Sequence, residues 1–133
     1  MASSFLLCLA LNVYHEARGE PLAGQMAVAN VTWNRAERDP ERLCEVVYKP
    51  NQFSWVKDKP TVKDSKAYQT ALAVSVLSWL FYSVDFSRGA TYYHTHSVNP
   101  NWNQHMKTTR VIGSHKFMRS KNHATQTPPN QRR

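Results

Sequence analysis

Two glutamates stand four residues apart in the segment Tyr14–Pro21, whose sequence is YHEARGEP. The apolar residues before the first glutamate have the spacing of one helix face: Leu6, Leu9, Ala10 and Val13. Gly19 and Pro21 then favour the end of that helix. We therefore expect Glu16 in the last helical turn, against an apolar wall, where desolvation keeps a carboxylic acid protonated near neutral pH. Such an acid can protonate the oxygen of a glycosidic bond as that bond breaks.

The same residues have a simpler interpretation. Glu16, Arg18 and Glu20 also suit a solvated helix end with local ion pairs, and their spacing alone does not separate the two interpretations. For Glu20, a direct chemical role and a structural bond to Arg18 or Arg35 both stay open. The rest of the chain has to decide between these alternatives.

The elements that would position Glu16 are mainly helical. After the turn at Pro21, residues 22–36 carry two apolar stripes and predict a second helix that is nearly enclosed. The pair Asp39–Pro40 ends this helical pattern. Residues 43–48 form a short apolar piece that suits either a strand or a single helical turn.

The second half of the chain predicts one more helix and a little strand. Asp64–Ser65 can cap a helix that runs to about residue 81 or 82, and its two apolar faces predict that it is largely core. Ala90–His94 has the β-branched and aromatic character of a short strand. Residues 111–118 form a final packed segment, and a polar tail follows. The fold class that we predict is therefore mainly α (α+β), a single domain with a short β element.

Charge is distributed unevenly along the 133 residues, which carry a formal net charge of +8. All nine carboxylates lie at or before Asp85, whereas residues 86–133 contain eight Lys or Arg and no acid. An acid catalyst must therefore come from the first two-thirds of the chain. The basic last third suits a polyanionic partner, either nucleic acid or the anionic envelope of a bacterium.

The two cysteines and the N-terminus bear on where the protein acts. We expect Cys8 and Cys44 to be buried free thiols, although a pairing stays open, and neither belongs to a metal motif. The apolar start, residues 1–13, lacks the charged leading region and the cleavage site of a signal peptide, so we expect it to be part of the fold. No run approaches the ~20 apolar residues that a membrane span needs.

A glycan cleft needs aromatic rings for the faces of sugars and amides for N-acetyl groups. The candidates for substrate binding are Gln25, Asn34, Gln52, Phe53, Trp55, Tyr92, Tyr93, His94 and Trp102. The alternative for each of them is core packing. Because side chains alternate along a strand, one of the two adjacent tyrosines should face the cleft, and we favour Tyr93 with His94 beside it.

An ordered series of motifs resembles the SleB/CwlJ-type cell wall hydrolases, the family of the spore cortex-lytic enzymes. The series comprises YHEARGEP (14–21), GQMAVANV (24–31), Asn34–Arg35, CEVVY (44–48), QFSW (52–55), GATYYH (89–94), NPNW (99–102) and IGSHKF (112–117). The resemblance runs from about Leu9 to Arg119. It implies a lysozyme-like catalytic domain over residues 1–120, followed by a flexible basic tail, 121–133.

The resemblance also implies an activity. Members of this family cut the β-1,4 bond between N-acetylmuramic acid and N-acetylglucosamine in peptidoglycan, and the spore enzymes act as lytic transglycosylases that leave a 1,6-anhydro end. The catalytic glutamate of the family falls on Glu16, with Arg18, Gly19 and Glu20 as structural parts of the motif. A transglycosylase needs one carboxylate, whereas ordinary glycosidases need two. We expect no cofactor and no metal.

The chain lacks the secretion signal and the N-terminal peptidoglycan-binding repeats of the full-length spore enzymes. We therefore expect a monomeric phage lysis enzyme or virion-associated wall hydrolase. It would be made in the host cytoplasm and act at the cell wall or periplasm, released by a holin or carried in a particle. The basic last third would hold it on the anionic envelope.

Three alternatives remain. A hydrolytic muramidase would use the same fold with water as the nucleophile. A zinc amidase or peptidase would use His94 and His96 with His105 or His115 as ligands, although this H-x-H pattern has low specificity. A nonenzymatic basic module that binds nucleic acid would leave the Glu16 motif without a purpose, so we expect no nucleic-acid partner.

Overall fold

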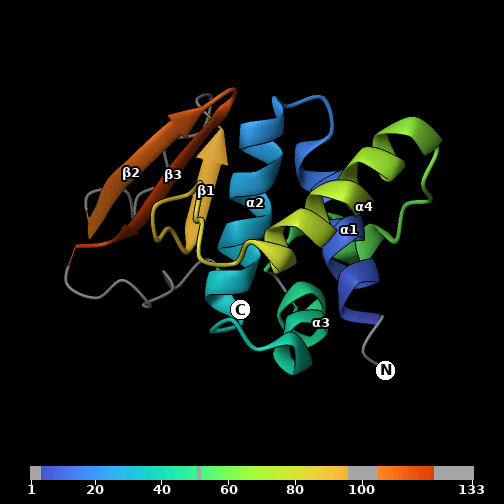
Figure 1. The fold of residues 1–133 in the computed structure, drawn as a ribbon, viewed down its shortest axis with the longest axis horizontal. Coiled ribbons are helices and arrows are strands. Elements are labelled where there is room, and N and C mark those ends of the chain that lie inside the picture. Colours follow the sequence, from blue (N-terminus) through green and yellow to red (C-terminus); the bar gives the residue numbers. More distant parts are fainter. Residues whose placement is uncertain (1–3, 51, 96–104, 122–133) are drawn as a thin grey trace.

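The computed structural model describes residues 4–50, 52–95 and 105–121, in which four helices, a 3-10 turn and three strands follow one another (Figure 1). The elements are α1 (Ser4–Ala17), α2 (Leu22–Arg35), α3 (Pro40–Tyr48), η1 (Ser54–Asp58), α4 (Ser65–Leu80), β1 (Tyr92–Thr95), β2 (Met106–Ile112) and β3 (His115–Ser120). The fold is mainly helical with a small sheet, as predicted. His96, Trp102 and the tail 122–133 lie outside the described residues.

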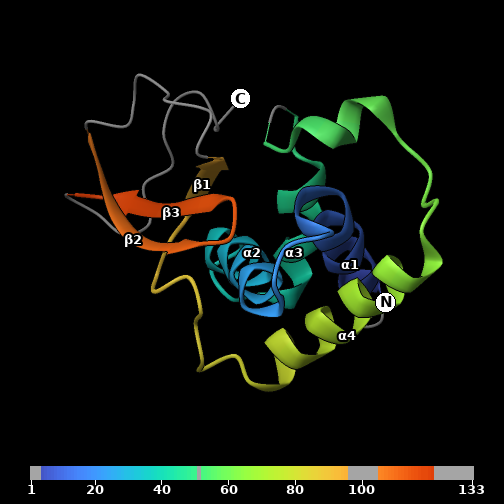
Figure 2. The ribbon, with the colours of Figure 1, turned by 90° about the horizontal axis from the view of Figure 1, so that it is seen from above.

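Two central helices carry the core. α2 lies between the sheet and α1, and α1 packs against α2, α3 and α4 (Figures 1 and 2). Every residue from Gly24 to Trp33 is buried, which confirms that α2 is enclosed. A polar pair lies inside this interface, where Asn12 Nδ2 donates to Thr32 Oγ1 at 3.1 Å.

Helix α2 ends at Arg35, before Asp39–Pro40, as predicted, but the piece 43–48, expected as a strand or a single helical turn, belongs to the nine-residue helix α3 and so was predicted wrongly. Pro40 occupies the first turn of α3, where its missing N–H costs nothing, and the Asp39 side chain caps that helix by accepting from Glu41 N at 2.9 Å. The expectation of free thiols was also wrong, because Cys8 of α1 and Cys44 of α3 form a disulfide. Two helices that pack side by side bring these residues together across a separation of 36 residues.

α4 was expected to be buried on two faces, and the structure buries only one. Its buried residues are small, namely Ala71, Val74, Ser75 and Ser78. Small side chains let α4 approach α1 and α2 closely, and Ser78 Oγ accepts a hydrogen bond from Trp33 Nε1 at 3.0 Å. The bulky apolar residues of the helix are exposed instead: Val76, Leu77, Trp79 and Leu80.

The segment expected to be a final packed piece is an antiparallel hairpin. β3 lies in the middle of the sheet, between β1 and β2, with Tyr93 opposite Phe117 and Ile112 opposite His115. The turn between β2 and β3 uses Gly113 at φ +56, a conformation that favours glycine. Among the described residues, no helix is both long and apolar enough to cross a membrane.

Candidate active site

Glu16 lies in the last turn of α1, and its carboxyl group meets β1. The hydroxyl of Tyr93 donates a hydrogen bond to Glu16 Oε1. The side chain is partly buried. Burial raises the pKa of Glu16, and the hydrogen bond from Tyr93 and the positive charge of Arg35 offset only part of this rise. The geometry therefore favours a carboxylic acid that keeps its proton.

Tyr93 is held in place by the neighbouring strand. Its ring lies 5.0 Å from the ring of His115 and 5.6 Å from that of Phe117, both on β3. Burial raises the pKa of Tyr93 well above its ordinary value, and the nearby carboxylate of Glu16 raises it further. Tyr93 thus stays protonated and can act as a hydrogen-bond donor.

Arg35, at the end of α2, completes the cluster. Its Nε donates to the backbone oxygen of Thr91 at 2.5 Å, and its guanidinium lies 4.9 Å from the ring centre of Phe53. Burial lowers the pKa of Arg35, whereas the adjacent Tyr93 and Glu16 raise it. A guanidinium keeps its charge in such surroundings, so the site contains a fixed cation beside the acid.

Glu20, the second carboxylate of the motif, is bound to the turn of the β2–β3 hairpin. Its side chain accepts from Ser114 N at 2.9 Å and from Ser114 Oγ at 2.5 Å, and its Oε1 lies 3.9 Å from His115 Nδ1. A Cβ at Gly113 would overlap this carboxylate. Glu20 therefore ties the end of α1 to the hairpin that supports Tyr93.

The predicted aromatic residues Phe53, Trp55 and Tyr92 have three different surroundings. Phe53 is buried under Arg35, and Trp55 stacks on His15 with ring centres 4.5 Å apart while donating to Asn12 Oδ1 at 2.8 Å. Tyr92 points to the opposite face of β1 from Tyr93. There it packs in a separate cluster with Met106 and Met118, and burial raises its pKa to about 12.

The predicted amides and His94 contact the protein's own backbone and side chains. Gln25 is buried and donates to the backbone oxygen of Glu20 at 3.1 Å. Asn34 donates to Asp85 Oδ2 at 3.0 Å and to the backbone oxygen of Ala90 at 2.9 Å, which positions the loop before β1. Gln52 is partly buried next to Phe53, and His94 Nδ1 lies 2.7 Å from Thr95 O.

Two further residues of the motif shape the end of α1. Gly19 has φ +86, which stops the helix as predicted. Arg18 lies with its guanidinium 4.7 Å from the ring centre of Tyr14, on another face of α1 from Glu16. Gly19 and Arg18 therefore shape the end of α1, and neither contact described here involves the carboxyl group of Glu16.

The zinc alternative depends partly on His96, which the structure does not describe. Within residues 4–50, 52–95 and 105–121, no three His, Cys, Asp or Glu side chains gather as metal ligands would. His115 instead packs against Tyr93 and Phe117.

Sequence reasoning assigned no role in the site to two residues that the structure brings there. Arg35 was considered only as a partner of Glu20, and His115 only as a metal ligand. The motif Asn34–Arg35 was a signal for the first of these, because an arginine at the end of an enclosed helix has to find partners inside the fold. Nothing in the sequence marked His115 as a neighbour of Tyr93.

Comparisons with known proteins identify the family and the fold of this chain. The family described as Cell Wall Hydrolase matches residues 19–118, a match that begins just after Glu16. A spore cortex-lytic enzyme of Halalkalibacterium halodurans is 32% identical over 112 residues, which are 82% of this chain and 33% of that protein. The spore cortex-lytic enzyme of Bacillus subtilis is 31% identical over 82% of this chain and 35% of its own length. The chain thus spans about a third of the length of these curated relatives.

Two solved structures have the same fold. The catalytic domain of the Bacillus cereus SleB protein superimposes with a TM-score of 0.68 and 27% identity, covering 88% of this chain and 91% of that domain. The catalytic domain of the germination-specific lytic transglycosylase SleB from Bacillus anthracis gives a TM-score of 0.67 and 28% identity, covering 86% and 93%. The described part of the chain therefore corresponds to a catalytic domain.

Proposed function

Because this chain belongs to the cell wall hydrolase family, we propose that it degrades peptidoglycan, as a lytic transglycosylase that uses Glu16 as its single catalytic acid and base. The bond that it cuts is the β-1,4 linkage between N-acetylmuramic acid and N-acetylglucosamine. One observation carries the proposal: a carboxylic acid with a raised pKa is held by Tyr93 beside the cation of Arg35. The name of the Bacillus anthracis relative supports the reaction type.

In the first half of the reaction, Glu16 gives its proton to the glycosidic oxygen, which leaves as the 4-hydroxyl of N-acetylglucosamine. Since Oε1 of Glu16 accepts the hydrogen bond from Tyr93, the transferred proton would come from the other carboxyl oxygen, Oε2. Positive charge develops at C1 of the muramic acid. The new carboxylate of Glu16 and the 2-acetamido group of the substrate can stabilise this charge.

In the second half, the carboxylate of Glu16 takes the proton from the C6 hydroxyl of the muramic acid as that oxygen attacks C1. A 1,6-anhydro ring forms, no water is consumed, and Glu16 returns to its protonated form. Arg35 and the hydroxyl of Tyr93 both favour the carboxylate during this interval. Glu20 takes no part in these steps, in keeping with its hydrogen bonds to Ser114.

The substitution Glu16→Gln tests this proposal, because it removes the transferable proton and keeps the shape. We expect wall lysis to fall by at least about a thousandfold, with an unchanged melting temperature. Mass spectrometry of the digest identifies the product. Anhydro-muramyl ends support the proposal, reducing muramic ends mean a hydrolytic muramidase, and free stem peptides mean an amidase. Full activity of Glu16→Gln would refute the role of Glu16.

The place of action belongs to the same proposal. The net charge of +8, concentrated after residue 86, suits an anionic wall, and the Cys8–Cys44 disulfide suits oxidising surroundings outside the cytoplasm. We infer a role in the lysis of a bacterial cell, as a phage enzyme would have. Purified protein added to bacteria with a permeabilised outer layer should lower the turbidity of the suspension, whereas Glu16→Gln should not.

A further inference from the structure

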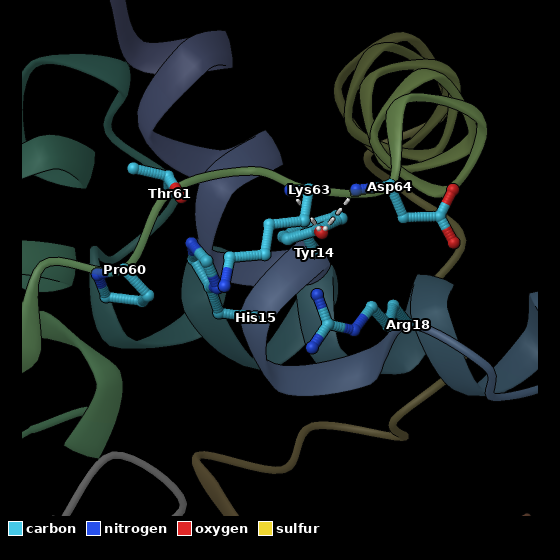
Figure 3. A pocket seen from close by; sticks show the side chains of 7 residues that line it. All are labelled: Tyr14, His15, Arg18, Pro60, Thr61, Lys63 and Asp64. Carbon is cyan, nitrogen blue, oxygen red and sulfur yellow. Dashed lines mark hydrogen bonds between the residues drawn. The ribbon is translucent and has the colours of Figure 1, made fainter.

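A pocket of about 380 Å³ lies beside the last turn of α1. One wall is formed by Tyr14, His15 and Arg18, and the other by the segment between η1 and α4, namely Pro60, Thr61, Lys63 and Asp64 (Figure 3). Tyr14 and Arg18 share one helix face, and Glu16 lies two residues from each of them. The pocket therefore lies on a different face of α1 from Glu16, and the proposed reaction does not use it.

The walls of this pocket are fixed before any ligand arrives. Tyr14 is fully buried, and its hydroxyl accepts from the backbone N–H of Lys63 at 3.1 Å and of Asp64 at 3.0 Å. Arg18 lies over the Tyr14 ring, and His15 stacks on Trp55 with ring planes 31° apart. A ligand would thus meet a preformed site, which lowers the cost of binding.

The charge of the pocket is positive. Arg18 and Lys63 are its two cations, and Lys63 extends toward His15 (Figure 3). The carboxylate of Asp64 points away from them and caps α4 instead, where it accepts from Ala67 N at 3.0 Å (Figure 3). The groups that face the hollow together therefore suit an anion.

His15 supplies an independent sign of a ligand. Its Nε2 atom is enclosed, and among the residues that the structure describes it has no hydrogen-bond partner. Burial lowers the pKa of His15, and the charge of Arg18 lowers it further, so the ring is neutral at neutral pH and one of its nitrogens carries a proton to donate. An enclosed ring nitrogen without a partner costs free energy that a bound acceptor would recover.

We propose that this pocket binds a carboxylate of the peptide stem of the peptidoglycan strand that is being cut. The proposal rests on the proposed function. The planar guanidinium of Arg18 matches a carboxylate, Lys63 adds a second charge, and Pro60 offers apolar contact for the aliphatic part of a peptide. His15 directly precedes Glu16, so the pocket adjoins the same turn of α1 that carries the proposed catalytic acid, and an extended stem of several residues could pass from the cleaved bond to it.

Binding is tested by nuclear magnetic resonance of the His15 imidazole, assigned with a His15→Gln variant. The probes are a synthetic stem peptide with free carboxylates, the same peptide fully amidated, and glycerol phosphate as the unit of teichoic acid. We expect the free peptide to shift the His15 resonances and the amidated peptide to leave them unchanged. Equal shifts with both peptides, or a shift with glycerol phosphate alone, would overturn the proposal.

A kinetic test uses glycan strands with intact stems and strands stripped of stems by an amidase. Lys63→Gln should raise KM for stem-bearing strands about tenfold with kcat unchanged, because the subsite acts in binding. Lys66→Gln, an exposed lysine outside the pocket, is the matched control and should behave as the wild type. An unchanged KM in Lys63→Gln would contradict the proposal. If the wild type cleaves neither kind of strand, the proposed function is refuted instead. The titration with stem peptides then still tests whether the pocket binds a carboxylate.

Discussion

At the scale of single residues, two adjacent tyrosines on β1 have opposite surroundings. Tyr93 donates its hydrogen bond to Glu16, whereas Tyr92 packs on the other face with Met106 and Met118. The same chemical change can therefore be made on either side of one strand. This contrast separates an effect on Glu16 from an effect on the strand.

The variant Tyr93→Phe removes the hydrogen bond that lowers the pKa of Glu16, so that pKa should rise further. In the proposed reaction, activity requires protonated Glu16 at the start of each turnover, so activity should fall as the pH rises through the pKa of Glu16. The falling limb of the kcat/KM profile should therefore move to higher pH, and kcat should drop about tenfold because the acid loses its fixed orientation. Tyr92→Phe should leave the position of that limb unchanged. A limb that stays in place in Tyr93→Phe would show that Tyr93 does not act on Glu16.

At the scale of elements, the hairpin turn and the end of α1 depend on each other. Gly113 combines a positive φ with close contact to the Glu20 carboxylate and to Pro21. Gly89 also has a positive φ, +81, but a Cβ atom added there would meet no heavy atom within 4 Å other than those of its chain neighbours. A comparison of alanine variants at the two glycines therefore separates the free-energy cost of backbone strain from the cost of steric contact.

Gly89→Ala should cost about 1 kcal/mol in the free energy of unfolding, from backbone strain alone. Gly113→Ala should cost about 3 kcal/mol, because the methyl group also displaces Glu20 from Ser114. Urea unfolding of the two variants beside the wild type measures this difference. Equal losses would mean that Glu20 does not hold the hairpin.

The disulfide joins α1, which carries Glu16, to α3. It closes a loop of 36 residues, which in the chain-entropy account stabilises the fold by about 4 kcal/mol. Dithiothreitol should therefore lower the midpoint of urea unfolding of the wild type. The double variant Cys8→Ala/Cys44→Ala is the control, and its midpoint should not respond to the reductant. A wild-type midpoint that is insensitive to dithiothreitol would contradict a stabilising role.

At the scale of the whole molecule, the charge asymmetry should govern adhesion to the wall. The sheet and its flanks carry exposed cations, including Lys107 and Lys121, while every acid lies at or before Asp85. Raising the salt concentration from about 0.05 to about 0.5 M should weaken binding to isolated walls at least tenfold, because screening shortens the reach of exposed charges. A sedimentation assay with Glu16→Gln, which leaves the walls intact, measures it. Binding that does not change with salt would exclude electrostatic adhesion.

The sequence alone determined the features that depend on local periodicity. The apolar spacing before Glu16 and the stop at Gly19 placed the first helix and put Glu16 at its end, the apolar stripes of residues 22–36 placed the second, and the cap at Asp64 placed α4. The ordered motifs indicated the family. The sequence also predicted that one of two adjacent tyrosines would face the site, because alternation along a strand is a local property.

Only the tertiary structure decided which distant residues meet. Tyr93 lies 77 residues from Glu16, and Ser114 lies 94 residues from Glu20. The partner of Cys8, the burial of one face of α4 and the position of Arg35 beside Glu16 likewise depend on how helices and strands pack. Periodicity shows which face of an element is apolar, but it does not show which other element covers that face. The glutamate that we propose as the proton donor could therefore be found in the sequence, whereas the groups that tune its pKa appeared only when the chain was folded.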